Sequence, residues 1–146
     1  MWTYQSQTVF EIPESAIGFI YRITNSITGR FYIGRKMLLS NRKKRLTKKE
    51  KLITENKRKT FKREIKPTDW KEYWGSSVDL KEDIAVFGKT KFSREILFFC
   101  DNKTDISFWE TAVQIKEDVL FRETYNRHIA NTKFYKNKVT NIQTKG

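Results

Sequence analysis

The chain has 146 residues, of which 38% are hydrophobic and 14% aromatic, and it carries 30 lysines and arginines against 17 acidic residues. This length predicts one domain, and the aromatic residues along the whole chain exclude a wholly disordered basic tail, because such a tail lacks the apolar area that offsets the entropy of ordering. The single cysteine and single histidine exclude an intrachain disulfide and a zinc site built from these two residue types alone.

The charge is concentrated in one segment. Residues 35–66 contain fifteen lysines and arginines but three acidic residues, so they carry +12 of the formal charge of +13. A basic segment in an almost neutral chain predicts a polyanionic partner, with nucleic acid ahead of an anionic membrane surface. The membrane is disfavoured because the segment has too few large apolar residues at helical spacing. With no transmembrane-length apolar run and no signal-peptide pattern, we expect an intracellular, cytoplasmic protein that does not bind membranes.

Two short stretches of β-branched and aromatic residues, at 18–24 and 30–34, flank a run of turn-forming residues. This pattern predicts a β-hairpin. If residues 25–28 form the loop, Tyr21 lies directly opposite Tyr32 on one face of the hairpin, with Cβ atoms about 4.5–5.5 Å apart.

The basic segment 35–66 is expected to be weakly helical in its middle. A short helix is predicted to follow over about 78–87, because its apolar residues share one face. Ser76 or Ser77 would cap its N-terminus, and Gly88 would follow its end.

Residues 92–99 predict a third strand, which is followed by a turn at 101–104. A second helix is predicted from Asp105 or Ser107 to about Leu120. Its core-facing stripe would consist of Trp109, Ala112, Val113, Val119 and Leu120. Beside that stripe, Glu110, Gln114 and Glu117 would lie together.

These elements predict an α/β fold of the α+β kind, with a small antiparallel sheet of about three strands flanked by helices. The domain would span residues 1–130 and contain a basic helical insertion at 43–66. The remaining residues, 131–146, would form a polar basic tail.

Two tyrosine motifs resemble a known signature. Gly18-Phe-Ile-Tyr21 is followed after ten residues by Tyr32-Ile-Gly34, which resembles the signature of the GIY-YIG endonucleases, with the first glycine one place earlier than in the commonest form. Arg42, ten residues after Tyr32, matches the position of the family's catalytic arginine. Glu110 and Asn126 then match in order, so the resemblance covers roughly residues 16–129 and is greatest to short, stand-alone, phage-encoded members.

The resemblance implies roles for the matched residues. Tyr21 would be the general base and Tyr32 would position the water or the phosphate. Arg42 would hold the scissile phosphate, because its planar guanidinium suits phosphate oxygens, with Arg35 as the rival. Asn126 would fix the arrangement by hydrogen bonding, and Tyr73 would stand where the family often has a histidine or tyrosine.

The chemistry sets two further requirements. A tyrosine acts as a base only if its pKa, ordinarily near 10, is lowered, and Arg35, Lys36 and Arg42 are the cations expected to lower it. Glu110 would bind one Mg²⁺ (or Mn²⁺) ion, because Mg²⁺ takes few protein carboxylates and keeps several waters. Glu117 is the alternative ligand.

Structural alternatives remain open for these residues. Tyr21 and Tyr32 could serve only to pack the strands, and Tyr73 could belong to an aromatic cluster with two tryptophans. Glu110 could close a capping box with Ser107, and Asn126 could be a turn residue.

The resulting hypothesis is a Mg²⁺-dependent DNA endonuclease acting in homing, restriction or host-DNA degradation, in the host cytoplasm if a phage encodes it. The duplex phosphates would be neutralised by Lys36, Lys43, Lys44, Arg45, Lys48, Lys49, Lys57, Arg58, Lys59, Lys62 and Arg63. One active site cuts one strand, so a double-strand break needs a homodimer, a higher oligomer or two successive nicks. The alternatives are a non-catalytic nucleic-acid-binding protein and a structure-specific repair nuclease.

Overall fold

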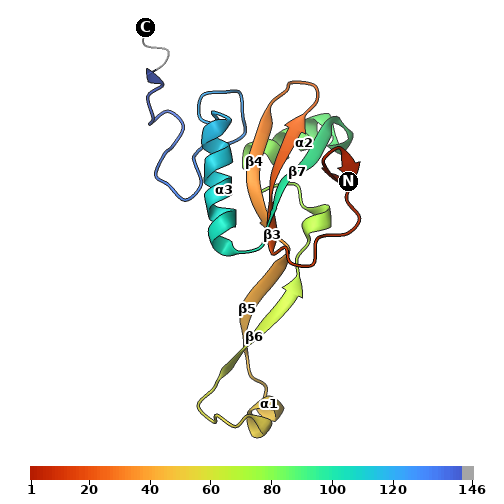
Figure 1. The fold of residues 1–146 in the computed structure, drawn as a ribbon, viewed down its shortest axis with the longest axis vertical. Coiled ribbons are helices and arrows are strands. Elements are labelled where there is room, and N and C mark those ends of the chain that lie inside the picture. Colours follow the sequence, from red (N-terminus) through yellow and green to blue (C-terminus); the bar gives the residue numbers. More distant parts are fainter. Residues whose placement is uncertain (143–146) are drawn as a thin grey trace.

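The computed structural model describes residues 1–142, and the described part contains a five-stranded sheet between two helical layers (Figure 1). Across the sheet the strands are β2 (Gln7–Thr8), β1 (Trp2–Tyr4), β7 (Phe92–Cys100), β3 (Gly18–Asn25) and β4 (Phe31–Met37). The mixed α+β class is therefore confirmed, with more strands than the three predicted. The sheet is not wholly antiparallel, because β1 pairs with β7 in parallel.

Side chains that alternate along β3 supply both halves of the core. Phe19, Tyr21 and Ile23 point to one face, which is covered by α2 (Val78–Phe87) and the short helix η1 (Trp70–Glu72). Ile20 points to the other face, which α3 (Lys103–Lys116) covers. β3 is buried on both sides because it lies between β7 and β4.

The β3–β4 hairpin forms, but its register differs by two residues from the prediction. Tyr21 pairs with Gly34 and Ile23 pairs with Tyr32. The loop is shifted by one residue relative to the prediction, because the Asn25 amide donates to the Arg30 carbonyl and the Asn25 side-chain oxygen accepts hydrogen bonds from the amides of residues 27 and 28. A shift of two preserves the face, so the rings of Tyr21 and Tyr32 remain neighbours with centroids 6.0 Å apart.

Gly34 is required by the close approach of the tyrosines. Because it is the cross-strand partner of Tyr21, a Cβ atom at Gly34 would lie 2.7 Å from the Tyr21 hydroxyl oxygen and 2.9 Å from Cε1 of Tyr32. The absent side chain is what lets both rings lie over the hairpin.

The two larger helices differ in how well the sequence predicted them. α2 runs over Val78–Phe87 with the Ser77 side chain as its N-cap, as predicted. α3 begins at Lys103, because Asn102 caps it by accepting a hydrogen bond from the Asp105 amide, and it ends at Lys116. The capping box with Ser107 is therefore wrong.

The buried face of α3 also differs from the predicted stripe. Its buried residues are Ile106, Glu110, Val113 and Gln114. Trp109 is 42% exposed and packs on Phe98 instead. The helix is therefore rotated relative to the prediction, and the rotation buries the carboxylate and the amide that were expected beside the stripe.

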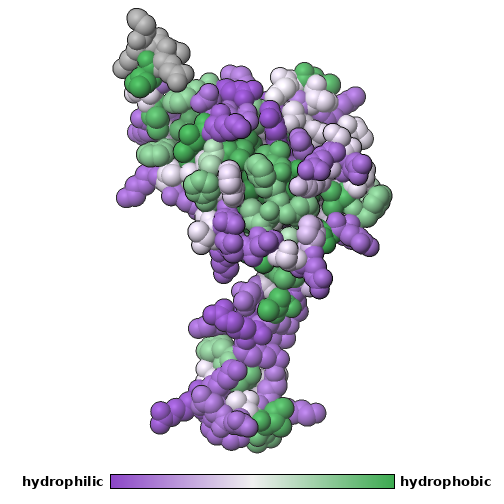
Figure 2. Space-filling view, in the orientation of Figure 1, coloured by the Kyte–Doolittle hydropathy of each residue, from purple (hydrophilic) through white to green (hydrophobic). Residues whose placement is uncertain are grey.

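The basic segment forms an arm that projects from the sheet (Figure 1). Strands β5 (Leu39–Arg45) and β6 (Phe61–Pro67) pair only with each other, and α1 (Lys48–Ile53) lies at the tip. The helix expected in the middle of the segment is present as the six residues of α1, whereas the rest of the predicted helical insertion is a two-stranded ribbon. Figure 2 shows a largely hydrophilic surface along the arm.

The C-terminal part of the described chain folds back on the segment that precedes it. The Ile129 amide donates to the Phe134 carbonyl at 2.8 Å, and the Lys136 amide donates to the Arg127 carbonyl at 2.7 Å. The last four residues of the expected tail, 143–146, lie outside the described residues. Among residues 1–142, no helix has the length and apolar character needed to cross a bilayer.

Gly34→Ala is expected to destabilise the fold by about 1–3 kcal/mol, because the new methyl group overpacks the space between the tyrosine rings. Urea unfolding measures the difference. The control is Gly29→Asn, since Gly29 has a φ of +78° and open space around it, and asparagine tolerates that conformation. Equal stability of the Gly34→Ala variant and the unmodified protein would contradict the close approach.

Candidate active site

Strand β4 is an edge strand whose outward backbone groups at Ile33 are satisfied by two side chains. The Asn126 amide oxygen accepts from the Ile33 N–H at 3.0 Å, and its amide nitrogen donates to the Ile33 carbonyl at 2.8 Å. Gln114 Nε2 donates to the same carbonyl at 2.8 Å. Because Ile33 lies between Tyr32 and Gly34, these bonds fix the motif strand to α3 and to the segment at 124–126.

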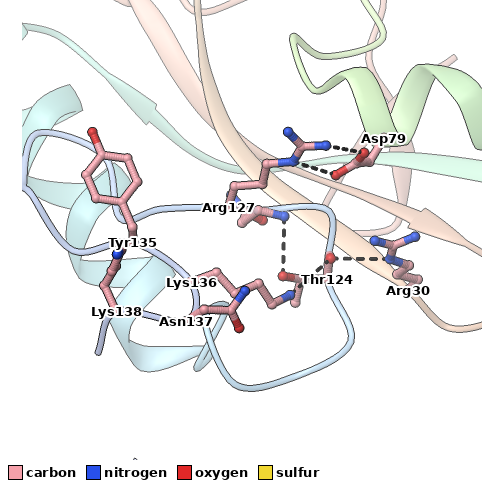
Figure 3. A pocket seen from close by; sticks show the side chains of 9 residues that line it. Arg30, Asp79, Thr124, Arg127, Tyr135, Lys136, Asn137 and Lys138 are labelled. Atoms are coloured by element: carbon pink, nitrogen blue, oxygen red, sulfur yellow. Dashed lines mark hydrogen bonds and ion pairs between the residues drawn. The ribbon is translucent and has the colours of Figure 1, made fainter. Parts of the chain in front are cut away.

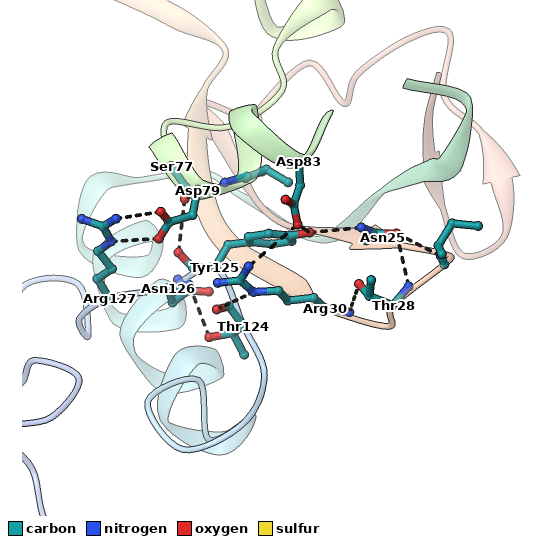
Figure 4. Close-up of polar contacts among 12 residues, drawn as sticks. Asn25, Thr28, Arg30, Ser77, Asp79, Asp83, Thr124, Tyr125, Asn126 and Arg127 are labelled. Carbon is teal, nitrogen blue, oxygen red and sulfur yellow. Dashed lines mark hydrogen bonds and ion pairs between the residues drawn. The ribbon is translucent and has the colours of Figure 1, made fainter. Parts of the chain in front are cut away.

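Tyr125 connects that segment to the rest of the domain (Figure 4). Its amide donates to the Phe31 carbonyl at 2.8 Å, and its hydroxyl donates to Asp83 on α2 at 2.6 Å. The same hydroxyl accepts from the Asn25 amide at 3.2 Å. A hydrogen-bonded network of this kind, partly buried at Asp83, holds one arrangement of its elements.

Glu110 is a buried carboxylate that lines a small cavity. The cavity has a volume of about 240 Å³ and lies between β4 and the N-terminal end of α2, with Tyr32, Ser76, Asn126 and His128 also in its wall. Glu110 is 8% exposed, and burial raises the pKa of its carboxyl, an effect that the Arg35 guanidinium partly offsets.

Arg35 is the arginine beside Glu110. Its Nε lies 3.6 Å from Oε1 of Glu110, and its terminal nitrogen donates to the Ser107 hydroxyl at 3.1 Å. The Arg35 side chain is 41% exposed, so its remaining donors are accessible from solvent.

Arg42 does not converge on this site, contrary to the expectation from spacing. It lies on β5 in the projecting arm, where its cross-strand partner is Glu64. Spacing alone suggested Arg42, whereas the chain leaves the sheet directly after Leu38 and carries Arg42 into the arm. Glu117, the alternative metal ligand, pairs with Arg122 at 3.1 Å and is absent from the cavity wall.

The two tyrosines occupy different environments. Tyr32 is half-buried, lines the cavity, and is hydrogen-bonded through its hydroxyl to the Ser76 hydroxyl at 3.2 Å. Tyr21 is only 1% exposed. Burial raises the pKa of Tyr32, and it raises the pKa of Tyr21 well above its ordinary value of 10.

The expectation of a lowered tyrosine pKa is therefore wrong, because the nearby cations have other partners. The Lys36 ammonium is hydrogen-bonded to Asp69 at 2.7 Å and lies 4.0 Å from the centre of the Tyr73 ring. Arg35 faces Glu110 and Ser107, so neither cation compensates for the burial of Tyr21 and Tyr32.

Tyr73 belongs to an aromatic cluster and also contacts Tyr21. The two rings meet edge to face, with centroids 5.9 Å apart. The guanidinium of Arg94 lies over the rings of Trp2 and Trp74 and donates to the Tyr73 carbonyl at 2.8 Å. Tyr73 therefore packs in the aromatic cluster and also lies next to the tyrosine motif.

Glu110 is the acidic side chain available for a cation in this cavity. Among residues 1–142, no three His, Cys, Asp or Glu side chains come together as a metal cluster. The amides of Asn126 and Gln114 are occupied by backbone partners. A single carboxylate facing a cavity of about 240 Å³ fits Mg²⁺, which binds through one or two carboxylates and substrate phosphates and keeps several waters.

A second hollow adjoins the first at Asn126 and Arg127 (Figure 3). Its volume is about 480 Å³, and its wall includes the cations Arg30, Arg127, Lys136 and Lys138. Arg127 is held by a bidentate pair with Asp79, at 2.8 and 2.7 Å. The sequence analysis identified none of these residues as part of a pocket.

Glu110→Gln is expected to raise the melting temperature at neutral pH and to have a smaller effect in acid. A carboxyl whose pKa is raised by folding contributes stability when protonated, and that stability is lost as the pH rises through its folded pKa. Thermal unfolding across pH measures this. Glu117→Gln, on an exposed ion pair of the same helix, is the control. A Glu110→Gln benefit that grows in acid would contradict the buried, destabilised carboxylate.

Comparison with known protein families identifies the family of the chain. The family model described as "Putative endonuclease segE, GIY-YIG domain" matches residues 2–139. No curated protein and no solved structure matches the chain. The matched range includes the tyrosine hairpin, the arm, Glu110 and Asn126. The chain therefore belongs to the segE-type GIY-YIG family of endonucleases, enzymes that hydrolyse the phosphodiester bonds of DNA.

Proposed function

We propose that this endonuclease cuts one strand of duplex DNA in the cavity between β4 and α2, with the help of one Mg²⁺ ion. The observation that carries the proposal is the convergence of Glu110 on α3 with Tyr32 and Arg35 on β4. Glu110 and Tyr32 offer a carboxylate and a hydroxyl in the wall of one cavity, and Arg35 places an exposed guanidinium beside the carboxylate.

Arg35 is proposed to hold the scissile phosphate in place of Arg42. Its guanidinium stays charged at any physiological pH and presents parallel donors to phosphate oxygens. Glu110 orients it from one side and Ser107 from the other. Charge that develops on the phosphate during hydrolysis would then meet a fixed positive group.

Glu110 is proposed to hold Mg²⁺, or Mn²⁺ in its place. A bound divalent cation supplies Lewis-acid stabilisation of the phosphate and of the leaving oxygen. The raised pKa of Glu110 means that cation binding competes with protonation at a higher pH than for an ordinary glutamate. Activity is expected to fall in acid for this reason.

Tyr32 is proposed to position the attacking water, because its hydroxyl faces the cavity and is oriented by Ser76. Tyr21 is proposed to pack against the Tyr32 ring and hold it in place, rather than to act as the base. Its hydroxyl is buried and its pKa is raised well above 10, so it remains protonated at neutral pH. Asn126 is proposed to position both tyrosines by binding the backbone of Ile33, which lies between Tyr32 and Gly34, the cross-strand partner of Tyr21. Tyr73 packs on Tyr21.

The arm is proposed to hold the duplex by neutralising its phosphates. Most of the cations in the basic segment lie on β5, β6, α1 and the tip loop, outside the catalytic cavity. Arg35 and Lys36 are the exceptions, because they lie on β4, with Lys36 beside Tyr73. A double-strand cut would then require a homodimer, a higher oligomer or two nicks.

Plasmid nicking in Mg²⁺ tests the enzyme and its arginine together. Arg35→Ala is expected to lower the nicking rate by roughly 100-fold or more, because it removes the fixed charge on the phosphate. Arg42→Ala is the matched control and is expected to change the rate by less than about threefold at low salt. Glu110→Ala should abolish nicking.

Two outcomes would count against this assignment. If Arg42→Ala is the more damaging arginine variant, the arm must fold onto the cavity when DNA binds, and the role of Arg35 is wrong. If the wild-type protein binds supercoiled DNA but leaves it intact in Mg²⁺ and in Mn²⁺, the proposed reaction itself fails.

The tyrosine roles are separable by removing one hydroxyl at a time. Tyr32→Phe is expected to lower the turnover rate by roughly 100-fold, because the attacking water loses the tyrosine hydroxyl that is proposed to position it. Tyr21→Phe is expected to cost about 1 kcal/mol of stability and to leave most of the turnover. Single-turnover nicking and urea unfolding measure the two effects. A larger catalytic loss for Tyr21→Phe would assign the base to Tyr21.

A further inference from the structure

The arm is a two-stranded ribbon whose two faces carry different side chains. Directly paired residues share a face, and successive residues alternate between faces. The pairing of Lys43 with Arg63 and of Lys44 with Lys62 therefore defines two sets. The odd face consists of Leu39, Asn41, Lys43, Arg45, Phe61, Arg63, Ile65 and Pro67. The even face consists of Ser40, Arg42, Lys44, Lys62, Glu64 and Lys66.

The even face is already neutralised in part. Glu64 pairs with Lys66 at 3.1 Å and with Lys44 at 3.8 Å. Lys62 pairs with Glu50 at the N-terminal end of α1. These contacts hold the pKa of Glu64 below its ordinary value, so the carboxylate stays charged beside its lysines at neutral pH. Three of the four cations of this face, Lys44, Lys62 and Lys66, thus have ion-pair partners within the arm.

The odd face has no acidic residue. Within residues 1–142, no ion pair engages Lys43, Arg45 or Arg63. Two large, exposed apolar side chains flank these cations: Phe61, at 47% exposure, is paired with Arg45 toward the tip, and Ile65, at 63%, follows Arg63 toward the base. The Lys43 ammonium is 5.8 Å from the centre of the Phe61 ring.

An isolated ribbon with exposed apolar residues is only marginally stable in water, so we expect a binding partner to cover this face. The charge on the face identifies what covers it. A second copy of the chain would bring the same unpaired cations against themselves, whereas a polyanion complements them. Unpaired cations next to exposed apolar side chains match the DNA major groove, which presents phosphates at its edges and thymine methyl groups within it.

The size of the ribbon agrees with this partner. The major groove is about 12 Å wide and admits a two-stranded β-ribbon, whereas the minor groove at about 6 Å does not. Seven residues of β5 extend for roughly 20 Å, which corresponds to about six base pairs. The contact would therefore span about half a helical turn.

The base of the arm fixes where this contact lies relative to the cut. Only Leu38 separates β4 from β5, and its side chain is 1% exposed. The Leu38 amide donates to the Ile17 carbonyl at 2.8 Å, and the Thr68 hydroxyl donates to the Met37 carbonyl at 2.6 Å. The strand that carries Tyr32 and Arg35 thus continues into the arm through an anchored joint.

We infer that the odd face of the arm enters the major groove of duplex DNA on one side of the cut, while the even face remains turned toward solvent. This inference rests on the proposed function, because it places the arm of the same nuclease on the same duplex. It adds the face, the groove and the asymmetry of the contact.

Equal charge can be removed from the two faces to test this. In the inactive Glu110→Ala background, Lys43→Gln/Arg63→Gln removes two odd-face cations and Lys44→Gln/Lys66→Gln removes two even-face cations. The odd-face pair is expected to weaken binding of a 30-base-pair duplex by roughly 10- to 100-fold at about 0.1 M salt and to reduce the slope of log affinity against log salt by about two. The even-face pair is expected to weaken it by less than about threefold.

Equal losses for the two pairs would overturn the inference, because the arm would then act as an undivided cationic surface. Ile65→Thr is expected to weaken binding without changing the salt slope, since it removes an apolar contact alone. If sedimentation velocity shows that Ile65→Thr dissociates a dimer, the odd face belongs to a second copy and the inference is wrong.

Methylation interference tests the groove assignment without any substitution in the arm. Dimethyl sulfate modifies guanine N7 in the major groove and adenine N3 in the minor groove. Binding by the Glu110→Ala protein to a duplex with a mapped nick site is expected to be blocked by guanine methylation over about six base pairs on one side of that site. Blocking by adenine methylation, or by neither, would overturn the groove assignment. Failure of the wild-type protein to nick DNA would instead reject the proposed function.

Discussion

The hydrogen bonds at Ile33 are the contacts on which the proposed catalytic arrangement depends. An edge strand leaves alternate backbone groups without partners, and here Asn126 and Gln114 supply them from two other parts of the chain. These bonds fix the position of β4 relative to α3. Arg35 and Tyr32 are consequently held in place relative to Glu110 before any substrate binds, and such preorganisation is what makes charge stabilisation effective.

The sequence predicted the parts of the structure that depend on local patterns. The hairpin, α2 and the third strand follow from turn formers, a serine cap and apolar periodicity. The arm was not predicted, because its strands are rich in lysine and arginine and lack the β-branched alternation that signals a strand. Their pairing joins residues up to 28 positions apart, from Leu39 to Pro67, and no local pattern encodes it.

The residues of the candidate site were predicted better than their geometry. Tyr21, Tyr32, Glu110 and Asn126 all lie around β4, but the hairpin register and the rotation of α3 decided how they meet. Arg35 replaced Arg42 at Glu110 because the chain turns away after Leu38, a long-range feature. The pKa expectation failed because burial of the tyrosines outweighs cations that already have acidic partners.

The occupied edge of β4 also limits how this protein can associate. Unpaired edge strands recruit strands from other molecules, which leads to sheet extension and aggregation. Here the outward groups of Phe31 and Ile33 are bound by the Tyr125 amide, Asn126 and Gln114. Two copies therefore cannot join their sheets through the part of this edge that carries the tyrosine motif, so any pairing that brings two cutting sites to one duplex must use another surface.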